Sequence, residues 1–212
     1  TLISGSKLKS LVHETPLNQK EGFYQYQMPD KTKSYVMVCD VSEGKGLDYS
    51  TIQVIDVSKM PYNQVATFRS NLITPTDFAS KIHLIGKLYN EASCLIEINS
   101  IGETVAYILH NDFEYPNILR TENAGRLGKK ITHKMGKTID NGIKMSVQTK
   151  ATGCSLLKLI VEADQLILND HNTIEELSRF SRKGRSYEAE PGSHDDLIMP
   201  LVSFAWLTDQ RY

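Results

Sequence analysis

The sequence predicts an α/β fold in which a mixed sheet is flanked by helices, and three observations support this prediction. An apolar run at residues 34–40 and an alternating run at 50–57 are both typical of strands. Thr74-Pro75-Thr76-Asp77 offers a capping hydroxyl, an early helical proline and an acid, which together indicate a helix start. A further apolar run at 93–98 follows this helix. Because a helical crossover joins parallel strands, we expect 34–40 and 93–98 to lie parallel in one sheet.

The segments before this helix predict an antiparallel meander. Residues 1–33 are polar and carry turn signals, so we expect a linker with one short edge strand. Tight connections join the strands at 34–40, 50–57 and 64–70, as in a three-strand antiparallel meander. We therefore expect the domain itself to span residues 34–212. A chain of 212 residues with 40% hydrophobic content can bury one full core.

The later segments continue the alternation of helices and strands. The helix that begins near Thr74 places Phe78, Ile82 and Ile85 on one face. The other expected elements are a helix near 101–112, a short strand near 117–120, a protruding basic β-hairpin or loop within 120–146, a helix at 147–162, a short strand at 165–168, a brief helix from 172 and a final helix capped by Ser193.

Carboxylates stand where two of the buried strands end. Asp40 closes the run that begins at 34, and Glu97 follows the apolar residues that begin at 93. A buried, unpaired charge is costly, so core packing does not explain these acids. Parallel neighbouring strands would bring both to one edge of the sheet, where ligands bind in open α/β folds. Since hard oxygen ligands suit Mg²⁺ or Mn²⁺, the pattern predicts a metal site.

A third acidic segment precedes the final apolar run. Asp195 and Asp196 are expected on the first turn of the last helix, where free N–H groups and the helix dipole favour anions. Two adjacent aspartates exceed what capping needs, so we expect a metal ligand here, with Asp195 favoured over Asp196. His194 could orient Asp195 or the leaving group. Glu43 is most simply a loop acid, and contact with a second ion is the alternative.

Positive charge is concentrated although the formal net charge is −1. Residues 120–150 hold eight Lys or Arg against two acids, so the rest of the chain carries −7. Clustered cations near a metal site indicate contact with a phosphate backbone, and a solvated hairpin is the plainer alternative. The expected DNA-binding residues are Arg120, Arg126, Lys129, Lys130, Lys134, Lys137, Lys144, Arg179, Arg182, Lys183 and Arg185.

Composition also limits the class of protein. No stretch approaches the roughly 20 apolar residues of a membrane span, and the N-terminus lacks signal-peptide regions, so we expect a soluble intracellular protein with no membrane partner. Cys39, Cys94 and Cys154 are an odd number at wide spacing. They are therefore expected to be small core residues rather than a disulfide frame or a zinc site.

Three phrases carry a family resemblance: VCDVSEGKGLDYST, LIEINSIG and EAEPGSHDDLIMPLVSFAW. With the order of elements, they resemble the C-terminal nuclease domain of the large terminase subunit of T-even-type tailed bacteriophages, from about residue 34 onward. The resemblance implies an RNase H-like fold and an endonuclease that cuts concatemeric viral double-stranded DNA during headful genome packaging. It also implies that Asp40, Glu97 and Asp195 or Asp196 form a Mg²⁺-binding catalytic triad.

The resemblance implies cofactors and partners as well. Two Mg²⁺ ions, roughly 4 Å apart and replaceable by Mn²⁺, would share Asp40, with Glu97 on one ion and Asp195 on the other. The expected partners are double-stranded DNA, the ATPase motor domain of the same full-length protein, the portal and the small terminase subunit. The expected location is the cytoplasm of the infected bacterium, transiently at the procapsid portal. The sequence has no GxxxxGK[ST] loop, so the resemblance does not extend to the motor half.

Two alternatives remain open from the sequence. One is a Holliday-junction resolvase or integrase of the same superfamily, which would prefer branched DNA over linear duplex. The other is a non-catalytic module that grips DNA or docks on the packaging motor, in which the acids would hold a structural ion. Cleavage that requires Mg²⁺ or Mn²⁺ would exclude the second alternative.

Overall fold

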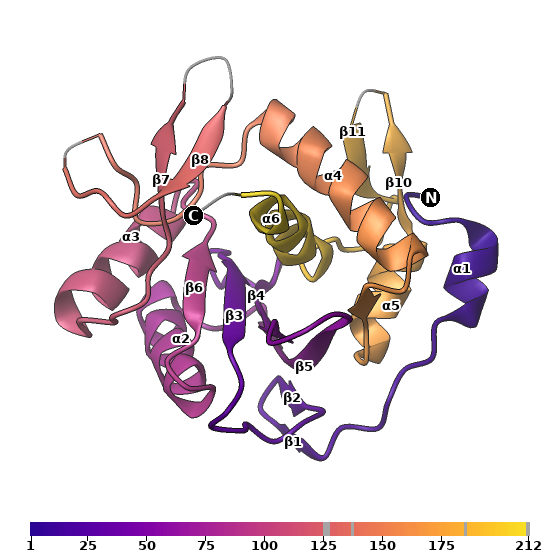
Figure 1. The fold of residues 1–212 in the computed structure, drawn as a ribbon, viewed down its shortest axis with the longest axis horizontal. Helices are drawn as coiled ribbons and strands as arrows, with labels where there is room; N and C mark the ends of the chain where they lie inside the picture. Colours follow the sequence, from indigo (N-terminus) through magenta and orange to yellow (C-terminus); the bar gives the residue numbers. More distant parts are fainter. Residues whose placement is uncertain (125–127, 137, 185, 211–212) are drawn as a thin grey trace.

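The computed structural model describes residues 1–124, 128–136, 138–184 and 186–210, so the predictions at Arg126, Lys137 and Arg185 lie outside the described residues (Figure 1). None of its helices is long and apolar enough to cross a membrane. The helices are α1 (Gly5–Ser10), α2 (Pro75–Leu88), α3 (Gly102–Tyr107), the π-helical turn η1 (Ile108–Asp112), α4 (Val147–Glu162), α5 (His171–Ser178) and α6 (Ile198–Thr208). The strands are β1 (Asn18–Lys20), β2 (Phe23–Gln25), β3 (Tyr35–Asp40), β4 (Ser50–Asp56), β5 (Tyr62–Ser70), β6 (Ser93–Ile96), β7 (Arg120–Asn123), β8 (Lys129–Thr132), β9 (Leu166–Ile167), β10 (Phe180–Lys183) and β11 (Ser186–Ala189).

A mixed sheet, seven-stranded over the described residues, forms the centre of the fold. Its order is β1-β2-β5-β4-β3-β6, and β9 pairs with β5. β3, β4 and β5 are antiparallel neighbours, whereas β6 lies parallel to β3, with Val36 opposite Ser93. The connecting helix α2 begins after Thr74, whose hydroxyl accepts a hydrogen bond from the Asp77 amide. The predicted meander, helix start and parallel crossover are all confirmed.

The two faces of the sheet pack against different helices, which cover both sides (Figure 1). Val38 belongs to the core formed with α4 and α6, whereas Cys39 belongs to the core formed with α2 and α3. Since side chains alternate along a strand, Asp40 lies on the same face as Val38. Leu95 also belongs to the core of α4 and α6. Glu97, two residues further on, therefore lies on that face as well.

The N-terminal segment contributes more than the predicted linker with one edge strand. Leu2 and Ile3 are each about 1% exposed, and the Leu2 amide donates to the carbonyl of Phe180 at 2.9 Å. β1 and β2 form an antiparallel pair, and β2 joins the sheet beside β5. The polar composition concealed β1 because all three of its residues are exposed, so it has no apolar alternation to detect.

The β7–β8 hairpin stands beyond the end of β6, whereas the β10–β11 hairpin stands beside α4 (Figure 1). β7 pairs with β8, which confirms the predicted basic hairpin, and β10 pairs with β11. The alternating stretch 142–145 lies outside the named strands. Its Ile143 forms a bridge to Glu97 and accepts a hydrogen bond from the Ile98 amide at 2.9 Å. This stretch therefore borders the end of β6 and is not part of the hairpin.

The final helix starts later than predicted. α6 begins at Ile198, and its N-cap residue is Leu197, whose side chain makes no capping hydrogen bond. Ser193 therefore does not cap α6, and Asp195 and Asp196 precede its first turn. The prediction was wrong because the Asp195 carbonyl accepts from the Ile198 and Met199 amides at 2.9 Å, and the Leu197 amide binds a carboxylate from α5 rather than a local side chain. The three cysteines, by contrast, are free and buried as predicted.

Candidate metal centre

Asp40 and Glu97 lie at the carboxyl end of the parallel strand pair. β3 and β6 stay in register up to Cys39 and Ile96, and the Glu97 amide donates to the carbonyl of Cys39 at 2.9 Å. Both acids lie on the sheet face that α4 and α6 cover. Glycine is required at 102, since a Cβ there would collide with the Glu97 carbonyl oxygen. The close approach of α3 therefore helps to fix the backbone of Glu97.

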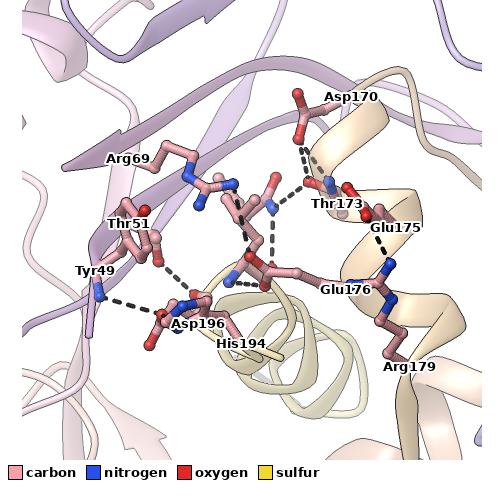
Figure 2. Close-up of polar contacts among 12 residues, drawn as sticks. Tyr49, Thr51, Arg69, Asp170, Thr173, Glu175, Glu176, Arg179, His194 and Asp196 are labelled. Atoms are coloured by element: carbon pink, nitrogen blue, oxygen red, sulfur yellow. Dashed lines mark hydrogen bonds and ion pairs between the residues drawn. The ribbon is translucent and has the colours of Figure 1, made fainter. Parts of the chain in front are cut away.

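The segment before α6 brings two further carboxylates to this place. Asp196 is buried, and its Oδ2 accepts a hydrogen bond from the Tyr49 amide at 3.1 Å. Thr51 Oγ1 of β4 donates to the Asp196 carbonyl at 2.5 Å (Figure 2). Asp195 is half-buried, and its Oδ2 accepts from the Ala189 amide at 3.3 Å. Contacts from β4 and from the end of β11 thus hold this segment beside β3.

Geometry places these acids at one end of the sheet, because Asp40 and Asp196 line the same cavity and Glu97 follows the strand that lies parallel to that of Asp40. Burial, followed by the charges of Glu97 and Asp196, raises the pKa of Asp40 well above its ordinary value. Burial raises the pKa of Glu97 against the lowering effect of the Lys150 ammonium, and Asp195 acts in the same direction as burial. Burial also raises the pKa of Asp196. Acids that raise one another's pKa form a cluster that a cation would stabilise.

A cavity of about 280 Å³ opens beside the cluster. Asp40 and Asp196 line it together with the loop between β3 and β4. Glu43 also lines the cavity, but its Oε2 lies 2.6 Å from Lys45 Nζ, and its side chain is 58% exposed. This surface ion pair supports the interpretation of Glu43 as a loop acid.

A second donor set lies at the edge of the cluster. Asp48, His194 and Asp196 each offer one ligand atom, and these atoms all lie within 4.8 Å of one another. His194 Nδ1 is 3.2 Å from Asp196 Oδ2, and its ring packs edge-on against Tyr49, with centroids 5.2 Å apart. Asp48 raises the pKa of Asp196, whereas His194 lowers it. Two carboxylates and one imidazole are suitable ligands for a divalent transition metal.

The donor chemistry therefore fits a divalent cation at this edge of the sheet. Asp40, Glu97, Asp195 and Asp196 supply hard oxygen atoms of the kind that bind Mg²⁺ or Mn²⁺. The pKa values of Asp40, Glu97 and Asp196 are raised, which means that their charged forms lack enough compensation from the protein alone. A bound cation would supply that compensation.

Lys150 is a residue of this site that the predicted set of DNA contacts omitted. It lies near the start of α4 and is half-buried, with Nζ 5.9 Å from the centroid of the Phe180 ring. Its charge lowers the pKa of Glu97. Among the described residues it forms no ion pair within 4.0 Å. Nothing in the local sequence distinguishes it from a solvated helix lysine, so only the fold places it here.

Most of the predicted DNA-binding cations in the described part of the chain have acidic partners. The pairs are Lys129–Asp140 (2.7 Å), Lys130–Glu122 (3.0 Å), Lys134–Glu122 (3.6 Å), Lys144–Glu103 (3.0 Å), Arg179–Glu175 (3.0 Å) and Lys183–Glu188 (3.1 Å). Arg120 donates to the Asn141 side chain at 3.0 Å, and Arg182 donates to the carbonyl of Gly184 at 3.2 Å. Much of the positive charge is therefore balanced locally, and DNA contact by these residues stays a prediction.

The fold and the site define a class of protein. An antiparallel meander, a parallel strand after a helical crossover and a terminal helix are the features of an RNase H-like protein, and the acids at β3, after β6 and before α6 are its candidate metal ligands. Residues 37–204 match the family described as Terminase RNaseH-like domain. The chain belongs to this family.

Solved structures with a similar fold come from the same group. The large terminase nuclease from thermophilic phage G20c with bound magnesium is 18% identical to this chain, with a TM-score of 0.70. The match covers 97% of this chain and 96% of the G20c chain. The large terminase nuclease domain of Thermus phage P74-26 is 19% identical, with 93% and 91% coverage and a TM-score of 0.66. The human cytomegalovirus terminase nuclease domain is 10% identical, with 98% and 95% coverage and a TM-score of 0.56. The predicted RNase H-like fold and terminase resemblance are confirmed, whereas these matches do not single out the T-even type.

Proposed function

We propose that this chain is the metal-dependent endonuclease domain of a viral terminase, cutting concatemeric double-stranded DNA during headful genome packaging. One observation carries the proposal: Asp40 and Asp196 line one cavity, and Glu97 follows the strand parallel to that of Asp40, so acids from separate segments lie at the same end of an RNase H-like sheet. Membership of the terminase RNase H-like family supports the same reaction.

The four converging acids would hold Mg²⁺, and two ions would act during catalysis. Bound Mg²⁺ would activate a water molecule and stabilise the leaving oxygen during in-line attack on a phosphodiester. Mn²⁺ would replace Mg²⁺ at the same oxygen atoms. The set of Asp48, His194 and Asp196 contains an imidazole, which suits transition metals better than Mg²⁺. Structures of the G20c nuclease are described with bound cobalt and bound zinc as well as magnesium.

Other side chains would bind and orient the DNA. Lys150, beside Glu97 and without an ion pair among the described residues, would contact the phosphate next to the scissile bond. Arg120, Arg182 and the exposed lysines of the two hairpins would contact phosphates further along the duplex without reading sequence. Arg182 lines one cavity together with Lys150, which favours this role, although many of the lysines are also paired with acids.

The proposed partners follow from the terminase family. They are the ATPase motor domain of the same full-length protein, the portal and the small terminase subunit. The proposed location is the cytoplasm of the infected bacterium, with transient docking at the procapsid portal.

Cleavage of supercoiled plasmid in defined metals tests the proposal. We expect nicked and linear products with Mg²⁺ or Mn²⁺ and none with Ca²⁺ or EDTA, because Ca²⁺ binds carboxylates without supporting the required geometry. Absence of cleavage in every metal, with DNA binding intact, would favour the gripping module instead. A strong preference for a four-way junction over linear duplex of the same length would favour a resolvase.

A further inference from the structure

The backbone that carries Asp195 and Asp196 is irregular, yet its polar groups are held by side chains from distant elements. Thr51 Oγ1 donates to the Asp196 carbonyl at 2.5 Å, and Gln53 Nε2 donates to the Leu197 carbonyl at 3.0 Å. The Leu197 amide donates to Glu176 Oε2 at 2.8 Å (Figure 2). The peptide between Asp196 and Leu197 is thus held from both its carbonyl and its amide side.

Glu176 supplies the only charged group in this set of contacts. It lies on α5, is 7% exposed, and binds the free amide at the start of a different helix, α6. A carboxylate at a helix N-terminus interacts favourably with the unpaired N–H groups there. Burial raises the pKa of Glu176 to about 7, although the Leu197 amide and Arg69 oppose this shift.

Arg69 connects Glu176 to the opposite side of Asp196. Arg69 Nη1 lies 3.9 Å from Glu176 Oε1, and its guanidinium carbon lies 4.1 Å from the centroid of the Tyr49 ring. Tyr49 in turn donates its amide proton to Asp196 Oδ2. The pair Glu176–Arg69 therefore contacts both the Leu197 amide, which follows Asp196 in the chain, and the ring of Tyr49, whose amide binds the Asp196 side chain (Figure 2).

A buried polar network fixes the start of the helix that carries Glu176. Asp170 caps α5, with Oδ2 accepting from the amide and the hydroxyl of Thr173 at 2.7 Å each. Tyr26 donates to Asp170 Oδ1 at 2.7 Å, and Gln53 Nε2 lies 3.2 Å from Thr173 Oγ1. Glu176 is thus presented to Leu197 from a firmly placed helix.

We propose that Glu176 is a positioning residue of the metal centre, which fixes Asp195 and Asp196 for cation binding through the Leu197 amide, with Arg69 holding it in place. This inference rests on the proposed metal-dependent function. Groups that orient metal ligands from behind typically change metal affinity by about 10- to 100-fold when removed.

Mn²⁺ titration by calorimetry without DNA tests the inference. We expect Glu176→Ala and Glu176→Asp to weaken Mn²⁺ binding by about tenfold or more, the latter because its shorter carboxylate no longer reaches the Leu197 amide. Glu176→Gln keeps an acceptor oxygen and should weaken binding by less than about threefold, in line with a small hydrogen-bond loss. Glu175→Ala, on the same helix but with an exposed side chain paired to Arg179, is the matched control and should bind Mn²⁺ like the wild type.

A second readout separates positioning from simple destabilisation. In Glu176→Asp the Mn²⁺ concentration for half-maximal plasmid nicking should rise by the factor seen in calorimetry, while the rate at saturating Mn²⁺ recovers. Wild-type Mn²⁺ affinity in a folded Glu176→Asp protein would overturn the inference about Glu176 and leave the proposed function intact. If the wild type itself binds no Mn²⁺, the proposed function fails and the inference falls with it.

Discussion

The basic hairpin region and the metal centre each collect charge of one sign, but the fold treats the two collections in opposite ways. Lys129 and Lys130 lie within 3.0 Å of acids that come from the same region. Asp40 and Glu97 instead lie beside further acids, and their pKa values are raised. The net charge of a segment therefore does not measure the charge available to a partner. A cluster whose charge the protein leaves uncompensated is the better marker of a site.

The largest expected effect comes from removing one charge of the uncompensated cluster. Asp40→Asn keeps the side-chain shape but removes a metal ligand, so we expect plasmid nicking in Mn²⁺ to fall by about 10³-fold or more, as for residues that act as a unit in catalysis. Single-turnover nicking assays measure this. Glu43→Gln, which changes a surface-paired acid on the same cavity, is the control and should retain at least about a third of the wild-type rate. Wild-type nicking by Asp40→Asn would contradict the site.

A smaller effect is expected from Lys150, whose charge acts on Glu97. Lys150→Met should slow cleavage by about 10- to 100-fold, because a cation beside the reacting phosphate is lost. The acid limb of the pH–rate profile should move to higher pH, since Lys150 no longer lowers the pKa of Glu97. Lys158→Met, on the exposed side of the same helix, should leave both the rate and the profile unchanged. An unshifted profile in Lys150→Met would place the lysine away from Glu97.

The raised pKa values predict an unusual dependence of stability on pH. An acid whose pKa is raised by folding contributes stability below its unfolded pKa, near 4, and loses that contribution as pH rises through the folded value. In EDTA, the free energy of unfolding of Asp40→Asn relative to that of the wild type should therefore be higher at pH 8 than at pH 5, by roughly 1–3 kcal/mol. Urea denaturation at both pH values measures the difference. In saturating Mn²⁺ the wild type should instead be more stable than Asp40→Asn, because only the wild type then binds the ion fully.

The smallest effects belong to the paired lysines. Lys134 has a 72% exposed side chain, so Lys134→Ala should weaken duplex binding a few-fold and reduce the salt slope by about 1. Lys129 has a 12% exposed side chain paired with Asp140, so Lys129→Ala should instead lower the melting temperature and leave the salt slope nearly unchanged. Fluorescence anisotropy at several salt concentrations and thermal melting measure these changes. Equal salt slopes in the two variants would show that the buried, paired Lys129 and the exposed Lys134 contribute equally to DNA binding, contrary to this account.

Sequence prediction succeeded where a local pattern decides the structure. The apolar runs of β3 and β6 and the capped start of α2 are local signals, and parallel pairing of the two strands then placed Asp40 beside Glu97. It failed where a contact crosses the fold. At the start of α6 the Leu197 amide binds Glu176 from α5, and no local side chain caps the helix. Asp48 lies in an exposed loop, so its closeness to His194 follows only from the folded chain.

The central claim is that acids from three separate segments bind a divalent cation at the end of β3 and β6. Anomalous diffraction from crystals soaked in Mn²⁺ tests it most directly, because the ion is located without any assumption about family. We predict an anomalous peak in contact with Asp40 and with Glu97, Asp195 or Asp196. Well-diffracting soaked crystals with no peak at these carboxylates, or with Mn²⁺ bound elsewhere on the domain, would contradict the account.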